Sequence, residues 1–331
     1  MLAAHIHRLG PPDVISYGEI PAPRPSHSDV LVEVEATTVN HVDTFVRSGA
    51  WRTPVEFPFV IGRDLVGRVV EAGAGATGFA PGDRVWSLSM GHGGRQGAAA
   101  ELVAVPSARL YPLPPGADGS SAVALAHPAT TAHLALFTHG RMSPGETVVV
   151  IGAAGNVGGA AVTLAVHAGA RVIAVASARD ADYCRALGAD VFEDAGSEAL
   201  HARLAAACPE GVDLYVDAAG RNEVDSTLGV LARRGRMVLL AGMADTARLP
   251  VGSLYLLDRS VTGFAISQAS TEELAEAARN VGGLVAAGRL RPRATEHLPL
   301  AEAAEAHRMV EDGRGRGKRF VLHVRPWVGG T

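Results

Sequence analysis

The segment TVVVIGAAGNVGGAAVTLAVHAGARVIAVASARD (Thr147–Asp180) places a glycine-rich turn between two apolar runs. The runs Thr147–Ile151 and Arg171–Ala176 have the composition of buried strands, and Val157–Ala168 between them has the length of a helix. A strand, a helix and a second strand in this order predict a crossover unit whose two strands lie parallel. The segment therefore indicates an α/β fold built on a parallel sheet.

The alternation of strands and helices continues from Ser120 to about Leu257, which predicts a doubly wound, Rossmann-type sheet. Short segments of helical length separate the apolar runs and supply the helices that cover the sheet. The further strands that we expect are Asp213–Asp217 and Arg236–Ala241, and the helices are Asp182–Leu187, Glu198–Ala207 and Val224–Ala232.

A different pattern precedes the segment LPPGA at residues 113–117. DVLVEVEATTV (Asp29–Val39) alternates apolar and polar residues, as a strand with one buried face does, and Pro and Gly separate several such runs. This pattern predicts an antiparallel, barrel-like domain. Its other expected strands are Asp64–Gly73, Gly82–Leu88 and Ala98–Pro106.

The C-terminal part predicts a strand at Ser260–Ile266, two helices and a closing strand. The helices are expected at Thr271–Ala287 and Ala301–Glu311, and the closing strand at Lys318–Val324. We therefore expect two domains: residues 1–118 with 267–331 form the barrel-containing domain, and residues 119–266 form the Rossmann domain.

The composition of the 331 residues excludes several classes of protein. A net charge of −4 without a basic stripe gives no signature of nucleic-acid binding. No apolar run approaches the ~20 residues that cross a bilayer, and the N-terminus has no secretory signal pattern. Cys184 and Cys208 are too few for a disulfide framework or a four-thiolate zinc site. We therefore expect a cytoplasmic protein with no membrane or nucleic-acid partner.

The turn AAGNVG at residues 153–158 has the spacing A-x-G-x-x-G after a strand and at the start of a helix. Gly155 lets the backbone approach a pyrophosphate, and Gly158 lets the helix pack closely on the strand. The first helical N–H groups, near Asn156 and Val157, point at the anion. We therefore expect these residues and Ala153 to bind a dinucleotide; a glycine-rich turn that only packs is the alternative.

The end of the second strand, ASARD, predicts which dinucleotide binds. NAD-specific units carry an acid about 20 residues beyond the turn, whereas this chain has Ser177 followed by Arg179. A hydroxyl and a guanidinium hold a 2′-phosphate, and Tyr183 offers a further donor, so we expect NADPH. The alternatives are a helix-capping Ser177, a solvated Arg179 and a packing Tyr183. Asp180 or Asp182 could instead bind the ribose of NAD.

Two N-terminal segments carry a resemblance to a known family. TTVNHVDTFVRSGAW (Thr37–Trp51) and FPFVIGRDLVGRVVEAGAGATGFAPGDRVW (Phe57–Trp86), together with AAGNVG, resemble the medium-chain dehydrogenase/reductase superfamily. Within it, the chain is similar to the zinc-free, zeta-crystallin-like quinone oxidoreductases. The resemblance covers nearly the whole chain and implies a GroES-like antiparallel β-barrel domain in addition to the Rossmann domain. It also implies a homodimer in which Ser260–Ile266 pairs across the two-fold axis; from the sequence alone, this strand could equally be an internal edge.

The zinc alcohol dehydrogenases of this superfamily have a Cys in place of Asn40 and Gly-His-Glu in place of Gly62-Arg63-Asp64. Asn is a poor zinc ligand and Arg cannot be one, so we expect no metal. Without a Lewis acid, the acceptor must already be electrophilic. The resemblance therefore implies NADPH-dependent hydride transfer to a quinone or an α,β-unsaturated carbonyl.

The resemblance also implies the residues of the site. Asn40 and Asp43 are expected to face the nicotinamide, Trp51 to contact the substrate, and Arg63 to orient Asp43 or a substrate oxygen. A buried anchor is the alternative for Trp51, and a structural ion pair with Asp43 or Asp64 for Arg63. The remaining cofactor contacts expected from the family and from the strand ends are Thr131, Ala219, Gly220, Gly242, Met243, Phe264, Ala265 and, more weakly, Lys318.

Two other functions agree with the same features. An enoyl reductase that acts on a polyketide-like or acyl intermediate would use the same cofactor turn and an electrophilic acceptor. A non-catalytic NADPH-binding protein would keep the glycine-rich turn and reduce no acceptor. Measuring NADPH oxidation with a panel of quinones and enones distinguishes the enzymes from the binding protein.

Overall fold

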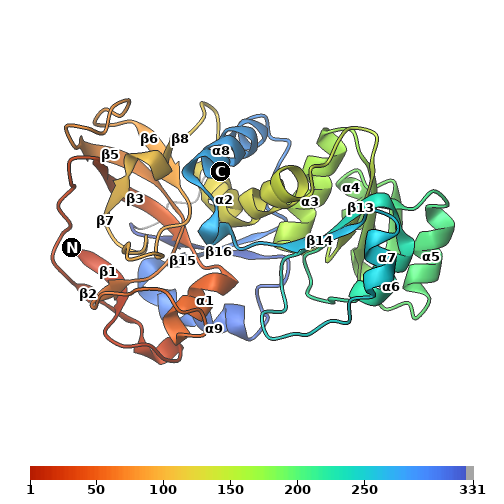
Figure 1. Cartoon of the computed structure of the whole chain (residues 1–331). Coiled ribbons are helices and arrows are strands. Elements are labelled where there is room, and N and C mark those ends of the chain that lie inside the picture. The colour runs from red at the N-terminus through yellow and green to blue at the C-terminus, as the bar shows by residue number, and fades with distance from the viewer. Residues whose placement is uncertain (326–331) are drawn as a thin grey trace. The chain divides into compact units, whose positions relative to one another are not determined.

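The computed structural model describes residues 1–325. Its residues cluster into two units, Met1–His127 with Ser270–Thr331 and Pro128–Ala269, whose elements are labelled in Figure 1. The sequence predicted divisions after residues 118 and 266, and the structure divides the chain after 127 and 269. The helix α2 (Gly119–His133) crosses the first division.

The second unit is built on a six-stranded sheet of order β11-β10-β9-β12-β13-β14, in which every neighbouring pair is parallel. This confirms the doubly wound parallel sheet. The strands β9 and β10 occupy the predicted ranges, whereas β11 was not predicted. The bounds are β9 Thr147–Ile151, β10 Arg171–Ala176, β11 Val191–Asp194, β12 Val212–Asp217, β13 Leu231–Leu239 and β14 Ser260–Gly263.

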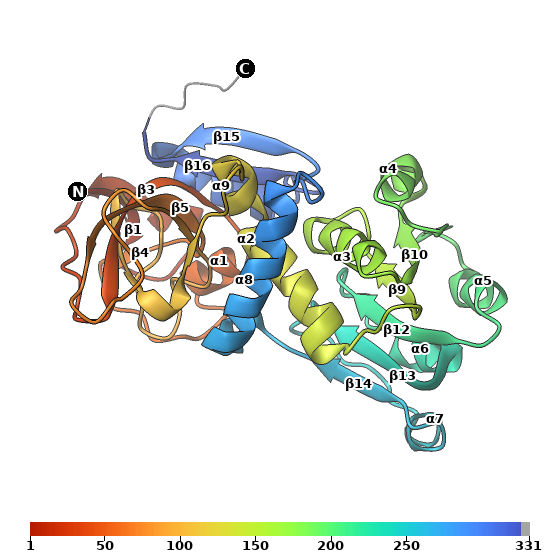
Figure 2. The same cartoon turned by 90° about the horizontal axis from the view of Figure 1, so that it is seen from above.

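The order of this sheet reverses between β9 and β12. The chain runs outward from β9 through β10 to β11, then returns to β12 on the other side of β9. Figure 2 shows α3 and α4 on one side of the sheet and α5 and α6 on the other, as right-handed crossovers require. The helices are α3 Asn156–His167, α4 Ala181–Ala186, α5 Leu200–Ala207, α6 Val224–Val230 and the short α7 Val251–Tyr255. Ligands of such sheets bind at the carboxyl ends of the strands where the order reverses.

The first unit contains a largely antiparallel sheet of order β15-β16-β3-β5-β6-β8, with β7 also paired to β3. The alternation in β3 buries Val30, Val32 and Val34, each at most 1% exposed, on one face. A smaller sheet has the order β2-β1-β4. The strands are β1 Leu2–Ile6, β2 Ser16–Glu19, β3 Asp29–Thr38, β4 Phe59–Val60, β5 Leu65–Ala72, β6 Arg84–Ser87, β7 Leu102–Pro106, β8 Leu110–Pro112, β15 Thr295–Pro299 and β16 Arg319–His323.

The helices of the first unit include α8 (Thr271–Ala286) and α9 (Ala303–Glu311), both close to their predicted ranges. A further helix, α1 (His41–Ser48), was not predicted. It begins at Asn40, whose backbone N–H donates to Asp43 Oδ2 at 2.7 Å, and ends at Gly49, which has φ 85°. In residues 1–325, none of the helices has the length and apolar character needed to cross a membrane.

Candidate active site and cofactor site

The turn between β9 and α3 has a geometry that only glycine permits. Gly152 has φ 77°, and its carbonyl accepts the N–H of Gly155 at 2.8 Å. A Cβ at Gly158 would overlap the Gly152 carbonyl, so α3 begins in direct contact with the turn. Ala153 and Ala154 are buried, while Gly155, Asn156 and Val157 are partly exposed. The N–H groups at the start of this twelve-residue helix can therefore hold a pyrophosphate.

The turns that follow β12 and β13 lie at the carboxyl ends of the strands, as the β9–α3 turn does. A Cβ at Gly152 would lie 3.0 Å from the Cβ of Ala219, and one at Gly220 would lie 3.1 Å from that of Ala241. Gly220 and Gly242 have φ of 71° and 87°. The predicted contacts Ala219, Gly220, Gly242 and Met243 thus lie on turns beside the β9–α3 turn, and Met243 is 60% exposed.

One buried carboxylate holds the turn after β12. Asp217, which is 1% exposed, accepts the N–H groups of Ala219 and Gly220 at 2.9 Å each and that of Asn222 at 2.7 Å. Asp217 was not among the residues predicted for the site. Its signal was the position at the end of an apolar strand before a glycine, where a carboxylate can order a turn.

The residues that follow β10 lie at the same edge. Ser177 is exposed, and its carbonyl accepts the N–H of Asp180 at 2.8 Å. The Arg179 side chain is 70% exposed, with Nε 3.9 Å from the buried Asp180 carboxylate. Asp182 is fully exposed and pairs with Arg185 at 3.1 Å. Ser177 and Arg179 are thus accessible, whereas Asp180 is buried and Asp182 is directed to solvent.

Tyr183 reaches from α4 toward the first turn of α3. Its hydroxyl would lie 2.9 Å from a Cβ at Gly159, the fourth residue of α3. The absence of a side chain at Gly159 therefore makes room for the phenol. This places Tyr183 beside the predicted phosphate-binding turn.

The other predicted cofactor residues are dispersed. Thr131 lies on α2, and Phe264, just after β14, stacks on His139 with ring centroids 4.1 Å apart. Ala265 is the next residue and is partly buried. Lys318 precedes β16 in the first unit, where Nζ pairs with Glu296 at 2.8 Å. The structure does not bring Lys318 together with the β9–α3 turn inside one unit, and its cofactor contact stays a prediction.

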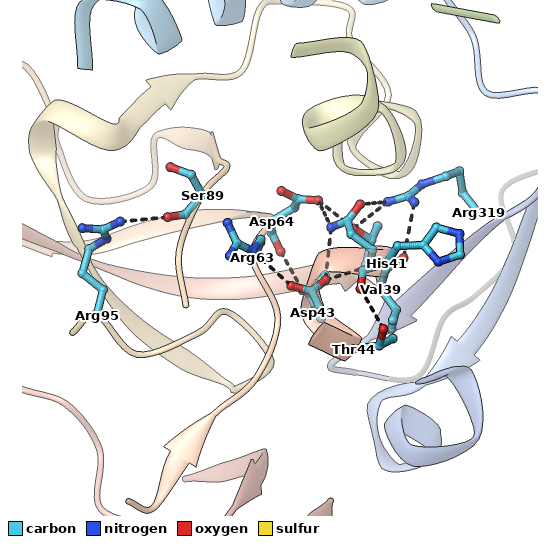
Figure 3. Close-up of polar contacts among 12 residues, drawn as sticks. Val39, His41, Asp43, Thr44, Arg63, Asp64, Ser89, Arg95 and Arg319 are labelled. Carbon is cyan, nitrogen blue, oxygen red and sulfur yellow. Dashed lines mark hydrogen bonds and ion pairs between the residues drawn. The ribbon is translucent and has the colours of Figure 1, made fainter. Parts of the chain in front are cut away.

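Three of the predicted catalytic residues meet in a buried polar cluster of the first unit (Figure 3). Asn40 is its centre: Nδ2 donates to Asp64 Oδ2 at 2.8 Å and to Asp43 Oδ2 at 3.2 Å. Arg63 is 1% exposed, and its Nε lies 3.5 Å from Asp43 Oδ1. The amide oxygen of Asn40 accepts a hydrogen bond from Arg319 at 2.7 Å. We call these five residues the Asn40 cluster.

Trp51 lies outside that cluster. It follows α1, is half-buried, and its ring centroid is 6.4 Å from that of His92 in an edge-on arrangement. Trp51 therefore borders the segment Ser89–Gly97 rather than the Asn40 amide.

Burial controls the charges of the Asn40 cluster. Burial raises the pKa of Asp43 to about 7, although the neighbouring Arg63 charge lowers it. The pKa of Asp64 is also raised by burial, against hydrogen bonds from Asn40 and Thr38. Burial lowers the pKa values of Arg63 and Arg319, and the charges of the two carboxyl groups raise them in part. Asp43 can therefore gain or lose a proton near neutral pH.

Two members of the cluster, Asp64 and Arg319, were missed as site residues. The sequence assigns Asp64 two roles, a replacement for a residue of the zinc enzymes and an ion partner of Arg63, and here it accepts from Asn40 and from Thr38 Oγ1 at 2.9 Å. Arg319 has no local signal, because only the antiparallel pairing of β16 with β3, with Val321 opposite Thr38, brings it to Asn40. Its Nε also donates to the carbonyl of Ala124 at 2.8 Å.

Comparisons with known proteins identify the family. Residues 26–115 match the family model described as the alcohol dehydrogenase GroES-like domain, and residues 156–282 match the model described as zinc-binding dehydrogenase. Quinone oxidoreductase from Rattus norvegicus is 28% identical over 325 residues, which cover 97% of each chain. The chain belongs to the medium-chain dehydrogenase/reductase superfamily, in its quinone oxidoreductase branch. This confirms the resemblance and identifies the protein as an oxidoreductase.

Further relatives of this medium-chain oxidoreductase differ in their described functions. The spectinabilin polyketide synthase system protein NorB of Streptomyces orinoci is 33% identical over 303 residues, or 90% of this chain and 13% of that protein. A solved structure titled NAD-dependent alcohol dehydrogenase is 29% identical, with a TM-score of 0.87 over 98% of this chain and 100% of that one. A mycobacterial protein complexed with NADPH is 29% identical, with a TM-score of 0.82 over 98% and 99% of the two chains. The superfamily thus suggests a nicotinamide cofactor.

The metal-binding capacity of this oxidoreductase can be judged from its side chains. Within residues 1–325, no group of three His, Cys, Asp or Glu side chains is arranged to hold a metal ion. At Asn40, the amide and the Asp64 carboxylate bind each other, and Arg63 brings a positive charge. Cys184 and Cys208 are buried residues of the second unit.

Proposed function

We propose that the protein is an NADPH-dependent, zinc-independent reductase that transfers a hydride to a quinone or an α,β-unsaturated carbonyl. The observation that carries the proposal is the exposed Ser177–Arg179 pair at the carboxyl end of β10, where NAD-specific proteins have an acid. The relative that was solved in complex with NADPH supports it. The relative titled as NAD-dependent is the reason to test both coenzymes.

The cofactor fits the residues of the second unit. The turn residues Ala153, Gly155, Asn156, Val157 and Gly158 would hold the pyrophosphate, because the close approach at Gly158 leaves the helix N–H groups facing outward. Ser177, Arg179 and Tyr183 would hold the 2′-phosphate. The nicotinamide supplies the hydride when bound. The residues proposed for its half of the molecule are Thr131, Ala219, Gly220, Gly242, Met243, Phe264, Ala265 and, on the family pattern alone, Lys318.

The acceptor site is proposed in the first unit, at the Asn40 cluster and Trp51. Reduction of an enone adds a hydride to its β-carbon and a proton to its α-carbon or oxygen. The Asp43 carboxyl, with a pKa raised to about 7 by burial, can hold that proton on Oδ1, the atom beside Arg63. Asn40 and Arg63 would orient Asp43, Arg63 would polarise the acceptor carbonyl, and Trp51 would pack against the ring or chain of the acceptor.

Zinc independence is proposed from the chemistry of the same residues. Asn40 uses both ends of its amide, donating to Asp43 and Asp64 and accepting from Arg319. Arg63 cannot be a ligand, and its charge opposes a cation nearby. One matching family model is described as a zinc-binding dehydrogenase, so metal analysis of the purified protein is a direct test. We expect less than about 0.1 equivalent of zinc per protein chain, the level of adventitious metal.

A second candidate is an enoyl reductase that acts on a polyketide-like or acyl intermediate. The 33% identity to a polyketide synthase system protein over most of this chain favours it. A non-catalytic NADPH-binding protein is the candidate from another class, and the raised pKa of Asp43 argues for catalysis against it.

The deciding experiment follows NADPH and NADH oxidation with simple quinones, simple enones and acyl thioester enones. NADPH turnover with quinones or simple enones supports the proposal, and turnover only with the thioesters supports the enoyl reductase. Cofactor binding without turnover on any acceptor supports the binding protein. A preference for NADH would contradict the role of Ser177 and Arg179.

We also propose a cytoplasmic homodimer. β14 is the last strand of its sheet, so one of its edges has no neighbour among the described strands. The chain just before it exposes apolar side chains, including Val251 at 61%, Tyr255 at 66% and Leu256 at 71%. A content of only two cysteines, both of them buried, agrees with a reducing compartment. Light scattering of the purified protein tests the dimer, and a monomeric mass at micromolar concentration would contradict it.

A further inference from the structure

A glycine-rich loop of the first unit, residues 91–97, is held firmly although it has no regular secondary structure. Cβ atoms at Gly91 and Gly97 would collide with the carbonyls of Gly62 and Ile61, so the loop packs backbone to backbone on that segment. The Gly91 N–H donates to Gln96 O at 3.1 Å and closes the loop on itself. The Gln96 side chain accepts the N–H of Val60 at 2.7 Å. The loop therefore gives Arg95 a defined position.

Arg95 and Arg109 converge on the same residue, Ser89. Arg95 donates to the Ser89 carbonyl at 3.2 Å, a contact drawn in Figure 3, and Arg109 donates to Ser89 Oγ at 2.9 Å. Both side chains are half-buried. Ser89 has φ 66°, a conformation rare for a residue with a side chain. Two guanidinium groups are thus gathered at one strained residue.

Within residues 1–325, this pair of arginines has no acidic partner. In the part of the chain that the structure describes, neither Arg95 nor Arg109 forms an ion pair with a carboxylate. Arg95 Nε is buried and has no hydrogen-bond partner there. The charges of Arg109 and Arg63, after burial, lower the pKa of Arg95 to about 10. Like charges close together without a counterion are costly, so the arrangement indicates a place for an anion.

The residues around the pair agree with a small organic anion. His92, in the same loop, has its pKa lowered to about 4 by burial and by the three arginines, so it is neutral at pH 7 and adds no charge. Its ring lies edge-on to Trp51, a residue of the proposed acceptor site. The charge of Arg63, a member of the Asn40 cluster that pairs with Asp43, acts on both Arg95 and His92.

We propose that Arg95 and Arg109 bind an oxyanion carried by the acceptor, so that the preferred substrates are enones or quinones bearing a carboxylate or a phosphoryl group. The inference rests on the proposed function and specifies its substrate class. Guanidinium groups bind planar or tetrahedral oxyanions through paired N–H donors. Arg63, which pairs with Asp43, would position the electrophilic part of the same molecule.

The kinetic test compares a carboxylated enone, 4-oxopent-2-enoate, with its uncharged methyl ester. We expect kcat/KM to favour the acid in the native protein. Arg95→Gln and Arg109→Gln should each lower kcat/KM for the acid about 10- to 100-fold and change that for the ester less than about 3-fold. Arg24→Gln, at an exposed position of the same unit, is the control. Arg95→Lys and Arg109→Lys keep the positive charge and should lower kcat/KM for the acid less than the Gln variants do. They replace the Gln variants in the test if a Gln variant is unstable.

A binding test is independent of turnover. Levulinate, the saturated and unreactive analogue of the acid, and inorganic phosphate are titrated by calorimetry into the native protein and the variants. Tighter binding of levulinate identifies a carboxylate as the natural group, and tighter binding of phosphate identifies a phosphoryl group. Both should weaken at least about 10-fold in Arg95→Gln.

The outcomes separate this inference from the proposed function. Equal reduction of acid and ester, with levulinate and phosphate unbound, would overturn the anion site and leave the reductase intact. Binding of either anion that Arg95→Gln abolishes, without turnover on any acceptor, would support the anion site and overturn the reductase. Anion binding unchanged in both Gln variants would also overturn the anion site.

Discussion

The guanidinium of Arg319 donates a 2.7 Å hydrogen bond to the side-chain oxygen of Asn40, across 279 residues of sequence. The same amide donates to Asp64 and to Asp43, so one neutral side chain joins two buried carboxyl groups to a buried cation. The network satisfies groups that would otherwise be costly to bury. Asn40 thus has a structural role whether or not it also contacts a substrate.

Asn40→Ala should lower the free energy of unfolding by about 2–4 kcal/mol, because it leaves Asp64 and Arg319 buried with fewer partners. Urea denaturation monitored by circular dichroism measures the change. Thr38→Val, which removes one donor to Asp64 and one acceptor of Arg319 but leaves the three hydrogen bonds of the Asn40 amide, should cost less. Gln268→Ala, at an exposed position, is the control. A loss below about 0.5 kcal/mol for Asn40→Ala would show that the network contributes little to stability.

Asp43→Asn should change how stability depends on pH. The pKa of Asp43 is about 7 in the folded protein, against 3.8 as its ordinary value, so the folded state binds the proton more tightly. This contribution is present below the ordinary value and is lost as pH rises through about 7. The unfolding free energy of Asp43→Asn should therefore rise relative to that of the native protein between pH 4 and 8, by roughly 2–4 kcal/mol.

Urea denaturation of both proteins at a series of pH values checks this sign. The neutral side chain of Asn resembles the protonated Asp43, so the two proteins should differ least in acid. A difference in stability that stays constant between pH 4 and 8 would mean that Asp43 titrates normally.

Gly158→Ala should weaken cofactor binding and destabilise the second unit, because the new Cβ would overlap the Gly152 carbonyl. We expect a loss of about 2–4 kcal/mol in unfolding free energy. The matched control is Gly229→Ala, in the exposed part of α6, where a Cβ would meet no atom within 4 Å. That change should stabilise the protein by about 0.5–1 kcal/mol. Thermal unfolding with and without NADPH measures both effects, and equal effects of the two substitutions would refute the tight-turn geometry.

Arg179→Glu should raise KM for NADPH strongly and leave KM for NADH nearly unchanged. The loss of a charge-assisted hydrogen bond and the repulsion of the 2′-phosphate together should cost about 2–3 kcal/mol. Arg233→Glu is the control, because Arg233 is also 70% exposed but lies near the amino end of β13, at the opposite edge of the sheet. Steady-state kinetics with both coenzymes tests the prediction. An unchanged ratio of the two KM values would remove Arg179 from the cofactor site.

The second unit was largely predictable because its signals are local. Apolar runs bounded by glycines located β9 and β10, and the A-x-G-x-x-G spacing located the turn on which α3 begins. β11 was missed because Val191–Asp194 contains two acids and resembles a loop. The helix α1 was missed although Asn40 and Asp43 have the spacing of a helix start, since that pair was interpreted only as a family signature.

The sequence by itself determined the class of fold, the family and the position of the glycine-rich turn before α3, because glycine geometry and strand periodicity act over short distances along the chain. The tertiary structure alone decided which charges meet: β16 pairs with β3 and brings Arg319 to Asn40, and the closed loop 91–97 brings Arg95 to the residue that Arg109 also contacts. The pKa of Asp43 depends on burial by distant segments, which no spacing in the sequence expresses.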